Sequence, residues 1–156
     1  MKSNMISKTI IFLILNFAAL AIGGLSTSSG VTSDWYNALN KAPWTPPGWV
    51  FGFAWTLIMI CFSFYMAYLW TEIEDKKTLI IMYAFQWILN VVWNPVFFTL
   101  HQTSLALIII TSLTLLIGYF LFKYFGQLRL TSTLLLPYFV WLLIASSLNA
   151  YIWLRN

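Results

Sequence analysis

Five apolar runs, each about 20 residues long, take up most of this 156-residue chain. A helix of about 20 residues rises roughly 30 Å, which is the thickness of the hydrocarbon core of a bilayer. The chain is 61% hydrophobic and 8% charged, whereas soluble domains carry roughly 25% charged residues. We therefore predict one all-α integral membrane domain over residues 1–156. It is a five-transmembrane-helix bundle with spans at about residues 5–25, 49–70, 78–100, 104–125 and 132–154.

The linkers between these runs differ in length. Residues 71–77, 101–103 and 126–131 are short turns, so the helices that they join are expected to be antiparallel neighbours. Residues 26–48 form the long connection, and Gly23 and Gly24 are interpreted as the end of the first helix. An odd number of spans places the two termini on opposite sides of the membrane.

The basic residues favour one orientation. One side holds Arg129 and most of the lysines, and the other side holds Lys41 and Arg155; the first set is Lys2, Lys8, Lys76, Lys77, Lys123 and Arg129. Cytoplasmic loops are enriched in Lys and Arg. We expect a cytoplasmic N-terminus, with the 26–48 loop, His101 and the C-terminus extracytoplasmic.

Several function classes are disfavoured. The central part of every run lacks Asp, Glu, Lys and Arg, which pumps and ion-coupled carriers need at depth. The chain also lacks a Ser/His/Asp set, a paired carboxylate and a phosphate-binding glycine loop. Cys61 lies in an apolar run without metal-ligand spacing, so we predict a buried hydrophobe and no metal site. The net charge of +4 is dispersed, which indicates loop orientation and not nucleic-acid binding.

Uncharged polar residues recur inside the runs. Gln86, Asn90 and Asn94 are spaced four apart and share one helix stripe. They either hydrogen-bond between helices or supply the polar groups of a ligand pocket. Asn16, Ala19 and Gly23 form a second stripe, which predicts close helix contact within the bundle or between protomers.

Tryptophans fall into two groups. Some lie at run ends or in the long loop, where an aromatic belt accounts for them: Trp35, Trp44, Trp49, Trp70 and Trp153. Others lie deeper than a belt: Trp55, Trp87, Trp93 and Trp141. The deep group favours either bundle packing or a flat aromatic cavity. Ala145, Leu148 and Asn149 share a face with Trp141 and fit both a cavity wall and a helix contact.

Three segments together resemble a known family. They are WYNALNKAPWTPPGWVFGFAW (35–55), QWILNVVWNPVFF (86–98) and LLLPYFVWLLIASSLNAYIW (134–153). They are similar in order and spacing to the TspO family, the tryptophan-rich sensory proteins, which includes the translocator proteins or peripheral-type benzodiazepine receptors. The resemblance covers nearly the whole chain.

The resemblance implies a homodimeric five-helix protein in the lipid bilayer that binds porphyrins such as protoporphyrin IX in an intramembrane aromatic pocket. Carried over by motif, the ligand-binding residues are Trp49, Phe51, Trp55, Gln86, Asn90, Trp93, Phe97, Trp141, Ala145 and Leu148. The loop then acts as a lid. Its prolines stiffen it, and its tryptophans form an apolar cover over the mouth of the bundle; these lid residues are Trp35, Pro43, Trp44, Pro46 and Pro47.

Three functions remain open. The resemblance favours a receptor or carrier in tetrapyrrole sensing or transport. One alternative is light-dependent oxidative degradation of protoporphyrin, with Trp55 and Trp141 as catalytic partners of the excited pigment; another is a structural partner of other membrane proteins. No cofactor is required, and metal-free porphyrin is favoured over haem because the single histidine, His101, lies in a turn. Tyr151 and Leu154 depart from the family's sterol motif, which counts against sterol binding.

Overall fold

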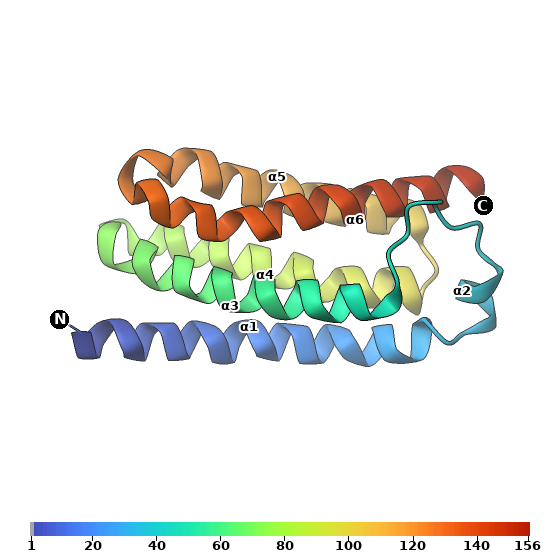
Figure 1. The fold of residues 1–156 in the computed structure, drawn as a ribbon, viewed down its shortest axis with the longest axis horizontal. Coiled ribbons are helices and arrows are strands. Elements are labelled where there is room, and N and C mark those ends of the chain that lie inside the picture. Colours follow the sequence, from blue (N-terminus) through green and yellow to red (C-terminus); the bar gives the residue numbers. More distant parts are fainter. Residues whose placement is uncertain (1) are drawn as a thin grey trace.

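The computed structural model is a bundle of long, roughly parallel rods (Figure 1). It describes residues 2–156, with side chains from residue 4 onward; the side chain of Lys2, counted above for orientation, lies outside the described residues. The elements in chain order are α1 (Lys2–Gly30), α2 (Asp34–Ala38), α3 (Gly48–Glu72), α4 (Lys76–Phe98), α5 (Thr103–Leu128), the 3₁₀ helix η1 (Arg129–Leu135) and α6 (Leu136–Arg155).

Four continuous helical stretches are long and apolar enough to cross a membrane. The last of them, Thr103–Arg155, contains α5, η1 and α6, and Figure 1 shows that the chain reverses there, so it supplies two crossings. Large apolar side chains such as Leu115 and Phe122 are exposed on the outside of the bundle, as lipid contact requires. The all-α, five-span, multi-pass membrane fold is confirmed, with the two termini at opposite ends (Figure 1).

The first helix corrects one prediction. α1 does not end near Leu25 but continues to Gly30, and the long connection therefore spans residues 31–47 and contains α2. This 31–47 segment is the lid loop from here on. Gly23 and Gly24 lie inside the helix, and Gly23 serves close packing there and not a turn. A Cβ atom on Gly23 would lie 2.5 Å from the Asn94 side chain of α4.

The second boundary that differs is the start of the last span. Residues 132–135, predicted as the beginning of a transmembrane helix, belong to η1, and α6 begins at Leu136. Pro137 stands in the first turn of α6, where its missing N–H costs no helical hydrogen bond. The remaining predicted spans agree with α3, α4 and α5 to within a few residues. The prediction that α3 and α4 are packed neighbours is wrong: α1 packs against both of them, and they do not pack closely against each other. A short turn fixes only how far apart two helix ends can lie, and the packing of α1 decides the rest.

The α1 stripe packs within the bundle. The amide of Asn16 donates to Ser63 Oγ on α3 (2.8 Å) and accepts from the Tyr83 hydroxyl on α4 (2.7 Å). At the other end of α1, a Cβ atom on Gly30 would lie 2.4 Å from the ring of Phe98. Small and polar residues thus bring α1 close to two neighbours, which is how helices associate in lipid.

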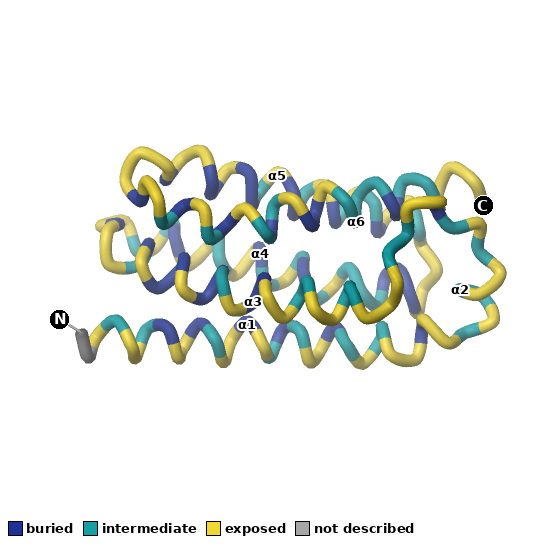
Figure 2. Tube along the Cα trace, viewed as in Figure 1, coloured by how far each residue is buried: buried dark blue, intermediate teal, exposed yellow. Residues whose placement is uncertain are grey.

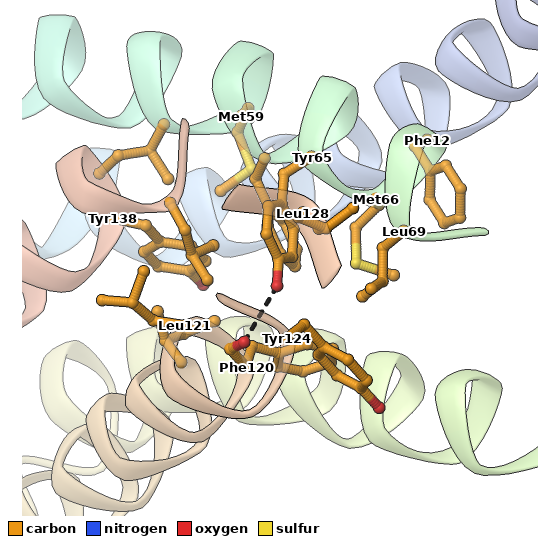
Figure 3. Packing of buried hydrophobic residues seen from close by; sticks show 14 of the residues in the cluster. Phe12, Met59, Tyr65, Met66, Leu69, Phe120, Leu121, Tyr124, Leu128 and Tyr138 are labelled. Atoms are coloured by element: carbon orange, nitrogen blue, oxygen red, sulfur yellow. Dashed lines mark hydrogen bonds between the residues drawn. The ribbon is translucent and has the colours of Figure 1, made fainter. Parts of the chain in front are cut away.

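The closed core occupies the half of the bundle nearer the N-terminus. Figure 3 shows side chains from α3, α5 and α6 meeting there, with the Tyr65 hydroxyl donating to the Phe120 carbonyl at 3.1 Å. Figure 2 shows buried positions turned inward and exposed positions along the outer faces. On α3 every buried residue lies between Ile58 and Leu69, so the first turns of this helix are not part of the core. That leaves room for a site in the other half.

Candidate functional site

A cavity of about 660 Å³ fills the half of the bundle beneath the lid loop. Ligand pockets in proteins commonly have about 300–1,000 Å³. Its walls come from α1, α3, α4 and α6, with Ile110 from α5 and several lid-loop residues. The core around Tyr138 closes its deep end.

Most of the residues predicted to bind a ligand line this one cavity. They are Phe51, Trp55, Asn90, Trp93, Phe97, Trp141, Ala145 and Leu148. They come from α3, α4 and α6 and lie far apart in the sequence, and the structure brings them together. The binding role itself stays a prediction.

Trp49 and Gln86 lie outside the cavity lining. Trp49 is 72% exposed at the start of α3 and turns outward, as a membrane-interface residue does. Gln86 is 1% exposed and lies one turn deeper than Asn90, where its side-chain N–H donates to the Tyr138 hydroxyl (2.7 Å). Gln86 Oε1 has no hydrogen-bond partner among the described residues.

Aromatic rings dominate the walls. The Phe51 ring meets the Trp141 ring edge-on at 5.3 Å, and Trp55 meets Tyr138 in the same way at 6.0 Å. On the opposite wall the Trp93 ring stacks on Phe97 at 5.1 Å with an interplanar angle of 15°. Edge-on and stacked pairs hold the rings in fixed orientations. The aromatic walls of the cavity are therefore rigid.

The asparagines on the cavity wall divide into two roles. Asn94 accepts a hydrogen bond from Thr27 on α1 (2.7 Å) and donates to the Asn90 carbonyl (3.0 Å), so it joins helices. Asn149 accepts from the Trp93 indole (3.1 Å) and donates to the Thr103 carbonyl (2.9 Å). Both of these amides orient the wall.

Asn90 differs from the other two. It is 8% exposed and lines the cavity, yet its side-chain amide has no hydrogen-bond partner among the described residues. The buried lining atom without a hydrogen-bond partner among the described residues is the Trp141 indole nitrogen, Nε1, and such an unpaired buried group is costly. Of the two interpretations of the 86–90–94 stripe, the structure favours interhelical bonding for Asn94 and a ligand-facing group for Asn90.

Sequence reasoning missed the wall that α1 contributes. Ala19, Leu20, Gly24 and Thr27 line the cavity, at helical spacing along one face. A Cβ atom added to Gly24 would have no neighbour within 4 Å, whereas the adjacent Gly23 packs tightly on Asn94. The Gly23-Gly24 pair was the signal that could have revealed this wall. Successive residues of a helix point in different directions, so two adjacent glycines can face two different neighbours.

The deep tryptophans do not all reach the cavity. Trp55, Trp93 and Trp141 line it, but Trp87 lies on the α1 side of α4. The Trp87 indole donates to the Leu15 carbonyl (2.8 Å) beside a separate shallow hollow of about 220 Å³. For Trp87 the bundle-packing interpretation is therefore the one that the structure supports.

The lid loop is fastened at both sides of the cavity mouth. Trp35 stacks on the His101 imidazole at 3.9 Å, while the Trp44 indole donates to Ser147 Oγ (3.1 Å). Neither tryptophan lines the cavity; the loop residues that do are Val31, Tyr36, Lys41, Thr45 and Pro46. Pro43 and Pro47 are exposed on the outer side of the loop. The tryptophans thus hold the cover in place, and other residues form its inner surface.

The titratable groups near the mouth are few. Burial raises the pKa of the Tyr36 phenol, so this group stays protonated. Among the described residues there is no group of three or more His, Cys, Asp and Glu side chains arranged to hold a metal ion. The cavity lining itself contains no His, Cys or Met within the described part of the chain.

Comparison with known proteins gives a consistent result along the chain. Residues 11–154 match the TspO/MBR family. The chain is 34% identical over 146 residues to the tryptophan-rich protein TspO of Archaeoglobus fulgidus, covering 89% of this chain and 92% of that protein. It is 32% identical over 139 residues to the tryptophan-rich sensory protein of Cereibacter sphaeroides, covering 88% and 87%. It is 28% identical over 143 residues to the translocator protein of Sus scrofa, covering 87% and 85%.

Proposed function

The chain belongs to the TspO/MBR family, and from this premise we propose that its cavity binds a porphyrin, of which protoporphyrin IX is the probe. The protein then acts as a membrane receptor or carrier in tetrapyrrole sensing or transport. One observation carries the proposal: a 660 Å³ cavity walled by aromatic rings, whose lining includes the Asn90 amide with no hydrogen bond among the described residues. Such a site offers flat apolar contact and one orienting hydrogen bond.

Metal-free porphyrin fits this lining better than haem does. Haem iron takes an axial His, Cys, Met or Tyr ligand, and Tyr36 is the one such side chain among the described residues of the lining. A phenol coordinates iron as phenolate, and burial raises the pKa of Tyr36, which disfavours that form. His101 is stacked under Trp35 and does not line the cavity.

The arrangement in the membrane is part of the same proposal. The lid loop and the C-terminus lie at one end of the bundle and the N-terminus at the other (Figure 1). The lysine and arginine distribution supports a cytoplasmic N-terminus, which places the cavity mouth on the extracytoplasmic side. The homodimer implied by the family stays a prediction.

The test is a titration of the detergent-solubilised protein with protoporphyrin IX, followed by quenching of tryptophan fluorescence. Trp55→Leu removes a ring from the cavity wall, and Trp87→Leu removes one from the same bundle outside the cavity. An aromatic pair contributes about 0.5–1.5 kcal/mol beyond its buried area, so Trp55→Leu should weaken binding about two- to tenfold. Trp87→Leu should leave the Kd unchanged. Failure of the parent protein to bind the pigment, or equal losses in both variants, would refute the proposal.

A second function is tested on the same sample. Trp55 and Trp141 come from different helices and line one cavity, so both rings would adjoin a porphyrin bound there and could take part in its light-dependent degradation. Under illumination the pigment absorption should then decay faster with the parent protein than with Trp55→Phe or Trp141→Phe. If the pigment decays equally fast in all three samples while binding is intact, the degradation function is ruled out and the receptor or carrier function stands.

A further inference from the structure

The cavity lining contains one charged side chain among the described residues, and it is Lys41. It lies on the lid loop, at the mouth, opposite the deep end that Trp55 and Trp141 form. The cavity is therefore polarised along its length, with a cation at the mouth and aromatic rings below.

Lys41 has no anionic partner within the described structure. Its ammonium nitrogen lies 4.5 Å from the centroid of the Tyr36 ring, which also lines the cavity. The chain has only four acidic residues. Asp34 is on the lid-loop side, whereas Glu72, Glu74 and Asp75 lie in or beside the α3–α4 turn at the opposite end. The charge of Lys41 is thus left uncompensated at the entrance to an apolar cavity.

An uncompensated cation in this position attracts an anionic group on whatever occupies the cavity. Attraction between opposite charges is stronger at a partly desolvated site than in bulk water, and hydrogen bonds to charged groups are stronger than neutral ones. The Tyr36 ring holds the ammonium in place without neutralising it.

We propose that Lys41 is a carboxylate-binding subsite: the cavity takes flat, apolar acids, whose carboxylate meets Lys41 while the ring system lies among the tryptophans below. This rests on the proposed function and adds to it the chemical class of the ligand and its direction in the cavity. Esters and other neutral analogues of the same ring are weaker ligands.

The competing role for Lys41 is an anchor for lipid phosphate, since lysines near helix ends extend to the membrane interface. That role predicts no dependence on the acid group of the ligand. The two roles are separated in micelles of an uncharged detergent, where phosphate headgroups are absent.

The experiment compares protoporphyrin IX, a dicarboxylic acid, with its dimethyl ester, which has the same ring and no charge. Each is titrated into the parent protein, Lys41→Met, Lys41→Arg and Arg155→Met. Arg155 is the matched control, because it is a cation at the same end that lies over the Tyr151 ring (5.6 Å) and does not line the cavity. Melting temperatures of all variants are measured on the same preparations.

The parent should bind the acid about tenfold or more tightly than the ester, the ratio expected for one charge-assisted hydrogen bond. Lys41→Met should remove that preference by weakening the acid and leaving the ester within about twofold. Lys41→Arg should keep the preference, and Arg155→Met should leave both affinities unchanged.

Two results overturn the inference while porphyrin binding stands. In one, the parent binds acid and ester equally; in the other, Lys41→Met weakens both by the same factor, which makes Lys41 a support of the lid loop. If the parent binds neither pigment, the proposed function is wrong and the subsite falls with it. The three failures are therefore distinguishable in one set of titrations.

Discussion

Ala145→Leu tests whether the α6 face beside Trp141 borders an open site or a helix contact. Ala145 is half-buried and lines the cavity. Leucine adds an isobutyl group in place of a methyl, and those atoms enter the space that a ligand would fill. We expect the Kd of protoporphyrin IX to rise by at least about tenfold, equivalent to about 1.4 kcal/mol, with little change in melting temperature.

Ala67→Leu is the matched control. Ala67 lies on α3, is fully buried in the core and does not line the cavity. The same change in side-chain size there overpacks the core, which costs roughly 1–3 kcal/mol. For a chain of this length 1 kcal/mol corresponds to about 2–4 °C in melting temperature. The control should therefore melt about 2–12 °C lower, with unchanged affinity in the fraction that remains folded.

Both quantities are measured on one detergent preparation of each protein, by thermal melting and by pigment titration. The reasoning is refuted if Ala145→Leu lowers the melting temperature and leaves the affinity unchanged. If it melts as low as the control and its folded fraction binds like the parent, Ala145 is a helix contact, and the cavity does not extend to this face.

Four other measurements test local features of the structure. Gly24→Ala should raise the melting temperature by a few degrees, because helix propensity improves by about 0.8–1 kcal/mol in open space, whereas Gly30→Ala should lower it because its Cβ has no room. Trp44→Phe removes an indole donor that holds the lid loop, so limited proteolysis of the loop should be faster, and protoporphyrin IX should slow it; equal rates would count against a lid. Hydrogen bonds from Thr78 lower the pKa of the Asp75 carboxyl, so its stabilising effect is present above the unfolded pKa of about 3.9 and is lost as pH falls through the lower folded value; Asp75→Asn should abolish that part of the acid dependence of melting. Reporter fusions should place the N-terminus in the cytoplasm and the C-terminus outside, and the opposite result would show that the lysine and arginine distribution was misleading.

The sequence alone determined the number of crossings, because runs of about 20 apolar residues can only be spans. Short turns predicted that successive spans are neighbours, which holds for α4 with α5 and for α5 with α6 but not for α3 with α4. Helical spacing also assigned Asn90, Trp93 and Phe97 to one face of α4, and all three line the cavity. Those inferences needed only the period of the helix and the thickness of the bilayer.

Tertiary structure decided what each face meets. Trp87 and Trp93 are alike in sequence, yet one donates to α1 and the other lines the cavity. Asn90 and Asn94 lie on one stripe, yet only Asn94 has its side chain hydrogen-bonded among the described residues. The α1 wall, with Gly24 at an open position, was also visible only in three dimensions. The physical reason is the solvent. In water, the outer face of a helix is polar and its inner face is apolar, so the sequence pattern distinguishes the two. In lipid the outer and inner faces are both apolar, so the pattern cannot say which neighbour covers a face.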